Sequence, residues 1–101
     1  MSRFDLWFTR EMEEAIQSDR KVCTSRREQH GTPGDVFTVR TVDYQIVDVL
    51  RVELAEIATL FYRLEGFDSP QEFRDFWVRI YGEPFSGWDM AYVHFFVRGE
   101  T

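Results

Sequence analysis

The segment from Ser69 to Gly82 constrains the fold more than any other part of the sequence. Ser69-Pro70-Gln71-Glu72 has the pattern of a helix start, with a serine cap, proline at the first helical position and glutamate three residues after the cap. The apolar residues that follow recur at helical spacing and are Phe73, Phe76, Trp77, Ile80 and Tyr81. We predict a helix that ends at Gly82 and packs this broad apolar face, as core, on a sheet or barrel wall.

Short runs rich in aliphatic and aromatic residues predict five strands, at residues 4–8, 21–25, 35–39, 44–53 and 90–98. The last run is apolar on both faces, which indicates a central strand. Two further helices are predicted, one capped by Thr9 and ending near Asp19, the other at residues 54–64 before Gly66. Thr32-Pro33-Gly34-Asp35 has the residues of a type II turn. The order β-α-β-β-β-α-α-β predicts a mainly β, α+β fold, in which a mixed β-barrel carries flanking helices.

Length and composition favour one domain over residues 1–101. The chain has 101 residues, of which 44% are hydrophobic and 17% aromatic, enough for one core. No apolar run is long enough to span a bilayer, and one cysteine with two separated histidines does not make a zinc site. We therefore expect a cytoplasmic monomer that uses no metal or other cofactor and does not contact membranes.

Charge points to one local surface. The net charge of -6 disfavours wholesale binding to phosphate backbones, so any contact with a nucleic acid must be local. The basic residues Arg20, Lys21, Arg26, Arg27 and His30 lie within eleven residues, and only Glu28 opposes them. This segment is a candidate for binding RNA or a nucleotide, and the alternative is a solvated basic loop without a ligand.

Five motifs occur in an order that resembles the ASCH domain. They are the segment from Gln17 to Arg26, Gly31-Thr32-Pro33-Gly34-Asp35, Glu65-Gly66-Phe67, Glu72-Phe73 with Ile80-Tyr81, and the closing His94-Phe95-Phe96. The resemblance covers nearly the whole chain. It implies a small barrel related to the PUA domain, with a cleft beside the barrel that binds RNA or handles nucleotides. A small bacterial branch of this family, the N4-acetylcytidine amidohydrolases, implies active-site roles for Lys21, Thr24 and Glu65.

Those three residue types suit acyl transfer. Thr24 would attack the acyl carbon, Lys21 would take the proton of its hydroxyl, and Glu65 would protonate the leaving amine. On a regular strand Lys21 and Thr24 point to opposite faces, so this mechanism requires a bulge or turn between them. Thr24 and Arg26 share a face, where Arg26 could hold a phosphate or a pyrimidine carbonyl.

Simpler roles remain open for the same residues. Lys21 could pair with an acid of the first helix, and Arg26 with Glu65 or Asp35, in an ion network without catalysis. Cys23 and His94 suit buried structural positions. One of four aromatic residues outside the helical stripe could stack on a base, and these are Tyr44, Tyr62, Trp88 and Tyr92.

Three functions follow from these patterns. The leading hypothesis is a module that binds RNA or a modified nucleoside in a cleft lined by Lys21, Thr24 and Arg26, with Arg20, Arg27, His30 and Tyr62 as further contacts. The second is an N4-acetylcytidine amidohydrolase that uses Lys21, Thr24 and Glu65. The third is an interaction module whose partner surface carries Trp7, Phe85 and Trp88.

Overall fold

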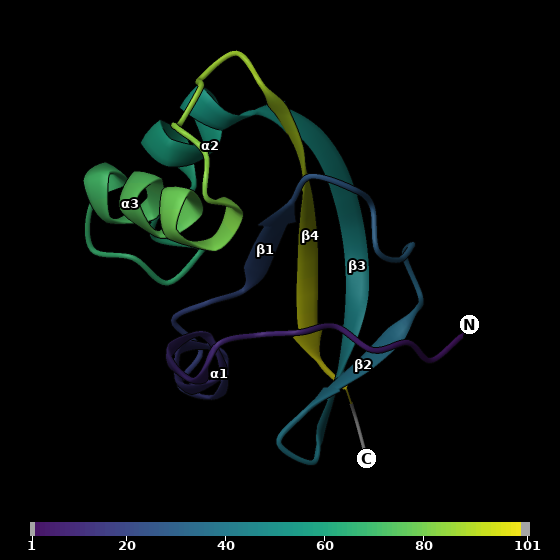
Figure 1. Ribbon diagram of the computed structural model, residues 1–101. Coiled ribbons are helices and arrows are strands. Elements are labelled where there is room, and N and C mark those ends of the chain that lie inside the picture. The colour runs from purple at the N-terminus through teal and green to yellow at the C-terminus, as the bar shows by residue number, and fades with distance from the viewer. Residues whose placement is uncertain (1, 100–101) are drawn as a thin grey trace.

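A computed structural model of the chain describes residues 2–99 and contains three helices and four strands within that range. In chain order they are α1 (Arg10–Gln17), β1 (Cys23–Arg26), β2 (Val36–Val39), β3 (Val42–Glu53), α2 (Leu54–Leu60), α3 (Pro70–Tyr81) and β4 (Met90–Arg98). The strands form one antiparallel sheet in the order β1-β4-β3-β2, which curls into a half-barrel (Figure 1). The predicted α+β class with flanking helices is confirmed.

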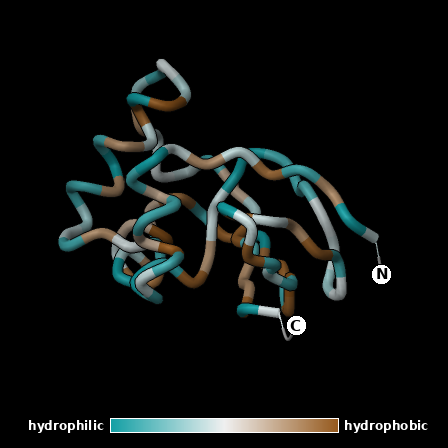
Figure 2. Tube along the Cα trace, turned by 90° about the horizontal axis from the view of Figure 1, so that it is seen from below, coloured by the Kyte–Doolittle hydropathy of each residue, from teal (hydrophilic) through white to brown (hydrophobic). Residues whose placement is uncertain are grey.

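Two hydrophobic clusters hold the helices to the sheet. The cluster under α1 contains Phe8, Met12, Ile16, Phe37, Val39, Tyr44, Ile46 and Phe96. The cluster under α2 and α3 contains Cys23, Leu54, Ile57, Ala58, Phe73, Trp77, Ala91 and Val93. Because both draw residues from β4, this strand is buried on both faces and lies between β1 and β3, which confirms the prediction of a central strand. In Figure 2, hydrophilic and hydrophobic residues alternate along the Cα trace.

The strand predicted at residues 4–8 is wrong. This segment crosses in front of the sheet (Figure 1), and its backbone joins β2 at a parallel bridge between Arg3 and Val36, with Phe4 N–H donating to Val36 O at 3.0 Å. Phe4, Leu6 and Phe8 pack onto the sheet instead of extending it, as Phe8 does against Phe37. The observed order therefore begins with α1.

Helix α3 begins and ends where predicted. The Ser69 side chain accepts a hydrogen bond from Glu72 N–H at 3.1 Å, Pro70 is the first helical residue, and Gly82 ends the helix with a φ of 70°. Glu72 reaches back to Asp68 N–H at 3.4 Å and not to the cap residue itself. The fixed start and end place the apolar face of α3 over β1 and β4.

The turns agree with the prediction at one place and depart from it at another. Gly34 has a φ of 99° and Asp35 N–H donates to Thr32 O at 3.0 Å, as a type II turn requires. Helix α2, in contrast, ends at Leu60 and not near residue 64, and residues 61–66 continue as turns up to Gly66, whose φ is 96°. These extra turns carry Glu65 toward β1. Among residues 2–99, no helix has the length and apolarity needed to cross a membrane.

Candidate functional site

The buried polar side chains lie together in one belt between the two hydrophobic clusters. Within the described part of the chain, the buried polar or charged residues are Lys21, Thr24, Ser25, Glu65 and His94. Strand β1 supplies Thr24 and Ser25, and His94 lies opposite Thr24 on β4. Burying this many polar groups costs free energy unless each finds a partner. The belt is therefore the place in the fold where polar side chains replace apolar core.

Lys21 and Glu65 form a buried ion pair at the centre of the belt. Lys21 Nζ donates to Glu65 Oε1 at 3.0 Å and to Glu65 O at 3.2 Å, and the two side chains are 1% and 3% exposed. The backbone fixes this geometry, because the two residues form an antiparallel bridge and Val22 N–H donates to Leu64 O at 2.8 Å. Lys21 is also the only lysine beside eleven arginines. The chain thus uses its one compact ammonium at its most buried cationic position.

Ser25 and Cys23 complete the surroundings of the Glu65 carboxylate. Residues 21, 23 and 25 alternate along one face of the β1 segment, as extended backbone requires. Ser25 Oγ donates a hydrogen bond to Glu65 Oε2, and Cys23 Sγ lies 3.7 Å from the same oxygen. Both carboxylate oxygens are therefore held, one by an ammonium and one by a hydroxyl.

Thr24 and Arg26 occupy the other face of β1. Arg26 Nε donates to Thr24 Oγ1 at 3.1 Å, Nη2 donates to Trp7 O at 2.6 Å, and the guanidinium lies 5.1 Å from the centre of the Phe8 ring. Among the described residues, Lys21 makes no hydrogen bond with Thr24, and Arg26 pairs with neither Glu65 nor Asp35. The structure gives Lys21 a different partner from the one that the Thr24 mechanism requires.

His94 ties β1 to the loop that follows it. Its Nε2 accepts from His30 N–H at 3.0 Å, so Nδ1 carries the proton and donates to Thr24 O at 3.1 Å. Burial lowers the pKa of His94, and the nearby charges of His30 and Arg26 lower it further. His94 is thus a neutral structural histidine, as its position in the sequence favours.

A cleft in two parts opens beside this belt. A small pocket of about 50 Å³ is lined by the polar residues Thr24, Ser25, Arg26 and Glu65. Its apolar walls are Trp7, Met12, Phe73, Phe76, Trp77, Ile80 and Tyr81. A groove of about 580 Å³ runs between α1 and α3. Met12, Glu65 and Phe76 line both parts, so Glu65 lies where the pocket meets the groove.

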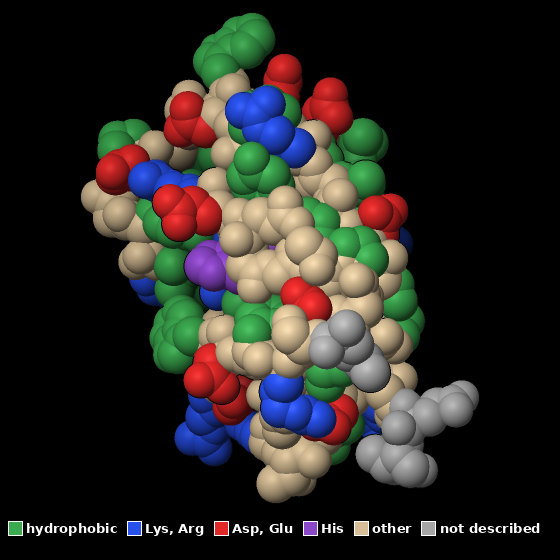
Figure 3. Space-filling view, turned by 90° about the vertical axis from the view of Figure 1, so that its right-hand side faces the viewer, with side chains coloured by type: hydrophobic (Ala, Val, Ile, Leu, Met, Phe, Trp, Pro, Cys, Tyr) green, Lys and Arg blue, Asp and Glu red, His purple; other side chains and the backbone are tan. Residues whose placement is uncertain are grey.

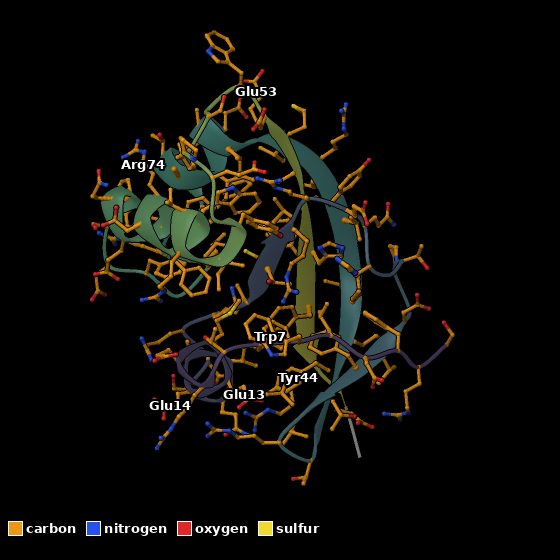
Figure 4. The ribbon with its side chains drawn as sticks, in the orientation of Figure 1. Trp7, Glu13, Glu14, Tyr44, Glu53 and Arg74 are labelled. Atoms are coloured by element: carbon orange, nitrogen blue, oxygen red, sulfur yellow. The ribbon has the colours of Figure 1, made fainter. Side chains whose placement is uncertain are left out.

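The groove is acidic. Its charged lining residues are Glu11, Glu14, Glu65, Asp68, Glu72 and Asp75, with Arg20 and Arg79. In Figure 4 the labelled Glu14 lies on α1, and Trp7 lies on the segment that leads into this helix. Trp7 is 63% exposed although it lines the pocket, which makes it a rim residue.

The predicted basic surface is divided among separate contacts. Arg27 pairs with Glu83 at 2.6 Å and stacks over Tyr81, and Tyr62 OH accepts from Arg63 Nε at 3.2 Å. Arg27, His30 and Tyr62 line neither part of the cleft, whereas Arg20 lines the groove. On the face in Figure 3, basic side chains are interspersed with acidic ones.

Sequence reasoning missed several cleft residues. Ser25, Trp7, Phe76 and Tyr81 line the pocket, and the last two belong to the helical face that the sequence predicts to be core throughout. Strand alternation with Lys21 could have placed Ser25 beside Glu65. The single lysine was a second signal for the site.

Comparison with solved structures identifies the fold. The sequence matches no family model and no curated protein. The ASCH domain from Lactobacillus crispatus superposes with a TM-score of 0.70 at 14% identity, over 96% of this chain and 78% of that one. A protein from Pyrococcus furiosus gives 0.65 at 18% identity over 98% and 99% of the two chains. The ASCH structure from Zymomonas mobilis gives 0.62 at 17% identity over 94% and 65%.

Proposed function

We propose that this chain, whose fold is that of the ASCH domain, binds a pyrimidine nucleoside in the cleft between α1 and α3. One observation carries the proposal: Glu65 lies at the junction of a groove large enough for a nucleoside and a small pocket lined in part by polar side chains. At about 580 Å³ the groove has the size usual for small-ligand sites, about 300–1,000 Å³.

The charges of the groove favour a nucleoside over a phosphate-rich strand. Carboxylates such as Glu11, Glu72 and Asp75 can accept hydrogen bonds from ribose hydroxyls, a contact that acidic residues make in other nucleotide sites. The same carboxylates repel phosphates, and Arg20 and Arg79 are too few to offset them. An RNA ligand would therefore enter as one exposed base with its ribose.

Recognition of the base would come from Arg26 and the aromatic walls. Arg26 has five N–H donors, and only part of them is used by Thr24 and Trp7, so others are free to meet a pyrimidine carbonyl. Trp7 and Phe76 provide flat apolar faces at the rim and at the junction, and stacking on such faces contributes about 1–3 kcal/mol per base.

Titration calorimetry with cytidine, N4-acetylcytidine, cytidine monophosphate and a short single-stranded RNA tests this proposal. We expect saturable binding of a nucleoside, weaker binding of the monophosphate, and a loss of at least about tenfold in affinity in Arg26→Ala. Arg51→Ala, an arginine exposed on β3 outside the cleft, is the matched control and should bind normally. Absence of saturable binding of any nucleoside would refute the proposal.

A second candidate function is hydrolysis of N4-acetylcytidine. It is favoured by the hydroxyls of Thr24 and Ser25, which line the same pocket as Glu65. In this reaction Glu65 would move the proton, Lys21 would orient the carboxylate, and Thr24 is the nucleophile that the sequence predicts. Chromatographic detection of cytidine released from N4-acetylcytidine tests it. Full activity in Lys21→Ala and Glu65→Gln would reject this assignment.

A further inference from the structure

We propose that Ser25 is an acyl-accepting nucleophile with Glu65 as its base, and that the small pocket beside it admits only a short acyl group. This inference deepens the proposed function, because it rests on a cleft that positions an acylated nucleoside. It assigns to Ser25 the role that the sequence alone suggests for Thr24.

The hydrogen bonds of the two hydroxyls distinguish Ser25 from Thr24. Ser25 Oγ–H is donated to Glu65 Oε2, so a carboxylate already receives the proton that a nucleophile must lose. Thr24 Oγ1 instead accepts from Arg26 Nε at 3.1 Å. Within the described chain, no carboxylate or imidazole nitrogen forms a hydrogen bond with the Thr24 hydroxyl. Ser25 therefore has a base in contact, whereas Thr24 has a cation.

Lys21 acts as a positioning residue in this arrangement. It holds Glu65 Oε1 at 3.0 Å while Oε2 faces Ser25, so the carboxylate cannot rotate away from the hydroxyl. Ser25 is 8% exposed and lines the pocket, which gives its oxygen access to a ligand. A nucleophile, a base in contact and an orienting group are the parts that covalent catalysis requires.

Cys23 is a poorer nucleophile although its sulfur lies near the same carboxylate. Burial is the main cause that raises the pKa of Cys23 well above its ordinary value, and the charge of Glu65 raises it further. The thiol therefore stays protonated and weakly nucleophilic. It is also fully buried and does not line the pocket.

The chemistry balances without a cofactor. Ser25 Oγ attacks the acyl carbon as its proton passes to Glu65 Oε2, and the tetrahedral oxyanion forms beside the remaining Arg26 N–H donors. The C–N bond breaks, and Glu65 returns the proton to the leaving amine. Water then gives a proton to Glu65 and attacks the acyl-serine. Ser25 Oγ leaves with that proton, and the carboxylic acid is released.

The pocket limits the acyl group. Its volume of about 50 Å³ compares with the roughly 10–15 Å³ that one water molecule needs on the same measure, so it holds a few non-hydrogen atoms, as in an acetyl group, and not an aromatic acyl group. The ribose would then occupy the larger groove on the other side of Glu65, and the base would lie at the junction with its carbonyl toward Arg26. Acyl-chain length should therefore control the rate.

Mapping the acylated residue tests the inference directly. The full chain is incubated with p-nitrophenyl acetate or N4-acetylcytidine, quenched in acid, digested and analysed by mass spectrometry. We expect an acetyl group on Ser25 in the unchanged protein, and the adduct should be lost in Ser25→Ala. Glu65→Gln should slow acylation by about 100-fold or more, and Arg51→Ala, the control outside the cleft, should retain the adduct. p-Nitrophenyl benzoate should react at least about tenfold more slowly than the acetate.

Several outcomes would overturn the inference. These are an acetyl group on Thr24 or on Lys21 in place of Ser25, or cytidine release that persists unchanged in Ser25→Ala. Because adducts are mapped in the unchanged protein, the test does not depend on how a variant folds. If nucleosides bind by calorimetry but Ser25 is never acylated, only this inference fails. If Ser25 is acylated by p-nitrophenyl acetate but no nucleoside binds, the proposed function fails.

Discussion

Glu65 determines the electrostatics of the belt, because it is the only carboxylate in contact with the buried Lys21 among the residues described. The Glu65→Gln variant would leave that ammonium buried without its counter-charge. Breaking a buried pair in this way costs about 3–5 kcal/mol, so we expect a loss of this size in the free energy of unfolding, measured by urea denaturation.

The matched control for Glu65→Gln is Glu83→Gln, which removes the exposed partner of Arg27. Exposed pairs contribute about 0–1 kcal/mol, so the free energy of unfolding of this variant should be close to that of the unchanged protein. Replacing both members of the buried pair, by Lys21→Met with Glu65→Leu, should recover part of the lost stability. Equal losses in Glu65→Gln and Glu83→Gln would contradict a buried pair.

His94 makes stability depend on pH. Its folded-state pKa is lowered by burial, so the unfolded chain binds the proton more readily. The contribution of neutral His94 to the free energy of unfolding should therefore be fully present above the pKa of about 6.5 that histidine has in the unfolded chain. It should be lost progressively as the pH falls below that value. The denaturant midpoint should decrease between about pH 7.5 and about pH 5.5 in the unchanged protein and change less in His94→Gln. His30→Gln keeps the backbone N–H that contacts His94 and removes only a lesser cause of the lowered pKa, so it should retain most of the dependence.

At the scale of elements, the turn at Gly66 positions the site. Gly66 has a φ of 96°, and a Cβ there would meet Ala15 Cβ and Lys21 Cβ, each at 3.2 Å. The Gly66→Ala variant should therefore incur the cost of a left-handed alanine, about 1–2 kcal/mol, and also push α1 and Lys21 apart. We expect a lower melting temperature and a weaker nucleoside affinity.

Gly82 provides the comparison for Gly66. It also has a positive φ, 70°, but a Cβ there would meet nothing within 4 Å. Gly82→Ala should therefore lose only the stability that a left-handed alanine costs, and it should leave ligand binding unchanged. The crowding assigned to Gly66 would be refuted if both variants lost equal stability and equal affinity.

Local chemistry explains which elements were predictable. Helix α3 is predictable to the residue because Ser69, Pro70 and Gly82 each determine the conformation or the hydrogen bonds of the backbone close to them. The β2–β3 hairpin turns at Arg40 and Thr41, both with positive φ, and neither is a usual residue there, so no sequence signal marks it. The segment at residues 4–8 has the composition of a strand, and only tertiary packing decides that it does not join the sheet.

Site residues divide in the same way. Motifs single out Lys21, Thr24, Arg26 and Glu65, and the structure brings all four into the belt or its pocket. Their pairing could not be predicted, because Glu65 reaches Lys21 through the turns after α2 and not from the helix itself. The neighbouring basic residues Arg27 and His30 lie close in sequence but outside the cleft.

For the molecule as a whole, the net charge determines how the affinity for a ligand depends on salt. The chain carries -6, and its groove is lined mainly by carboxylates. A neutral nucleoside displaces no counterions, so its affinity should change by less than about twofold between roughly 50 and 200 mM salt. Binding of single-stranded RNA that used several phosphate contacts would instead weaken steeply, with a log-log slope of about -0.7 per phosphate.

Titrations of a nucleoside and of a short RNA at several salt concentrations separate these cases. We expect a nearly flat dependence for both ligands, because the exposed base and its ribose would supply the contacts. Glu14→Lys changes one exposed acid of the groove to a base and should make RNA binding tighter and more sensitive to salt, while nucleoside affinity stays similar. A steep dependence for RNA in the unchanged protein would mean that phosphates are bound elsewhere on the surface, and the cleft between α1 and α3 would not be the RNA site.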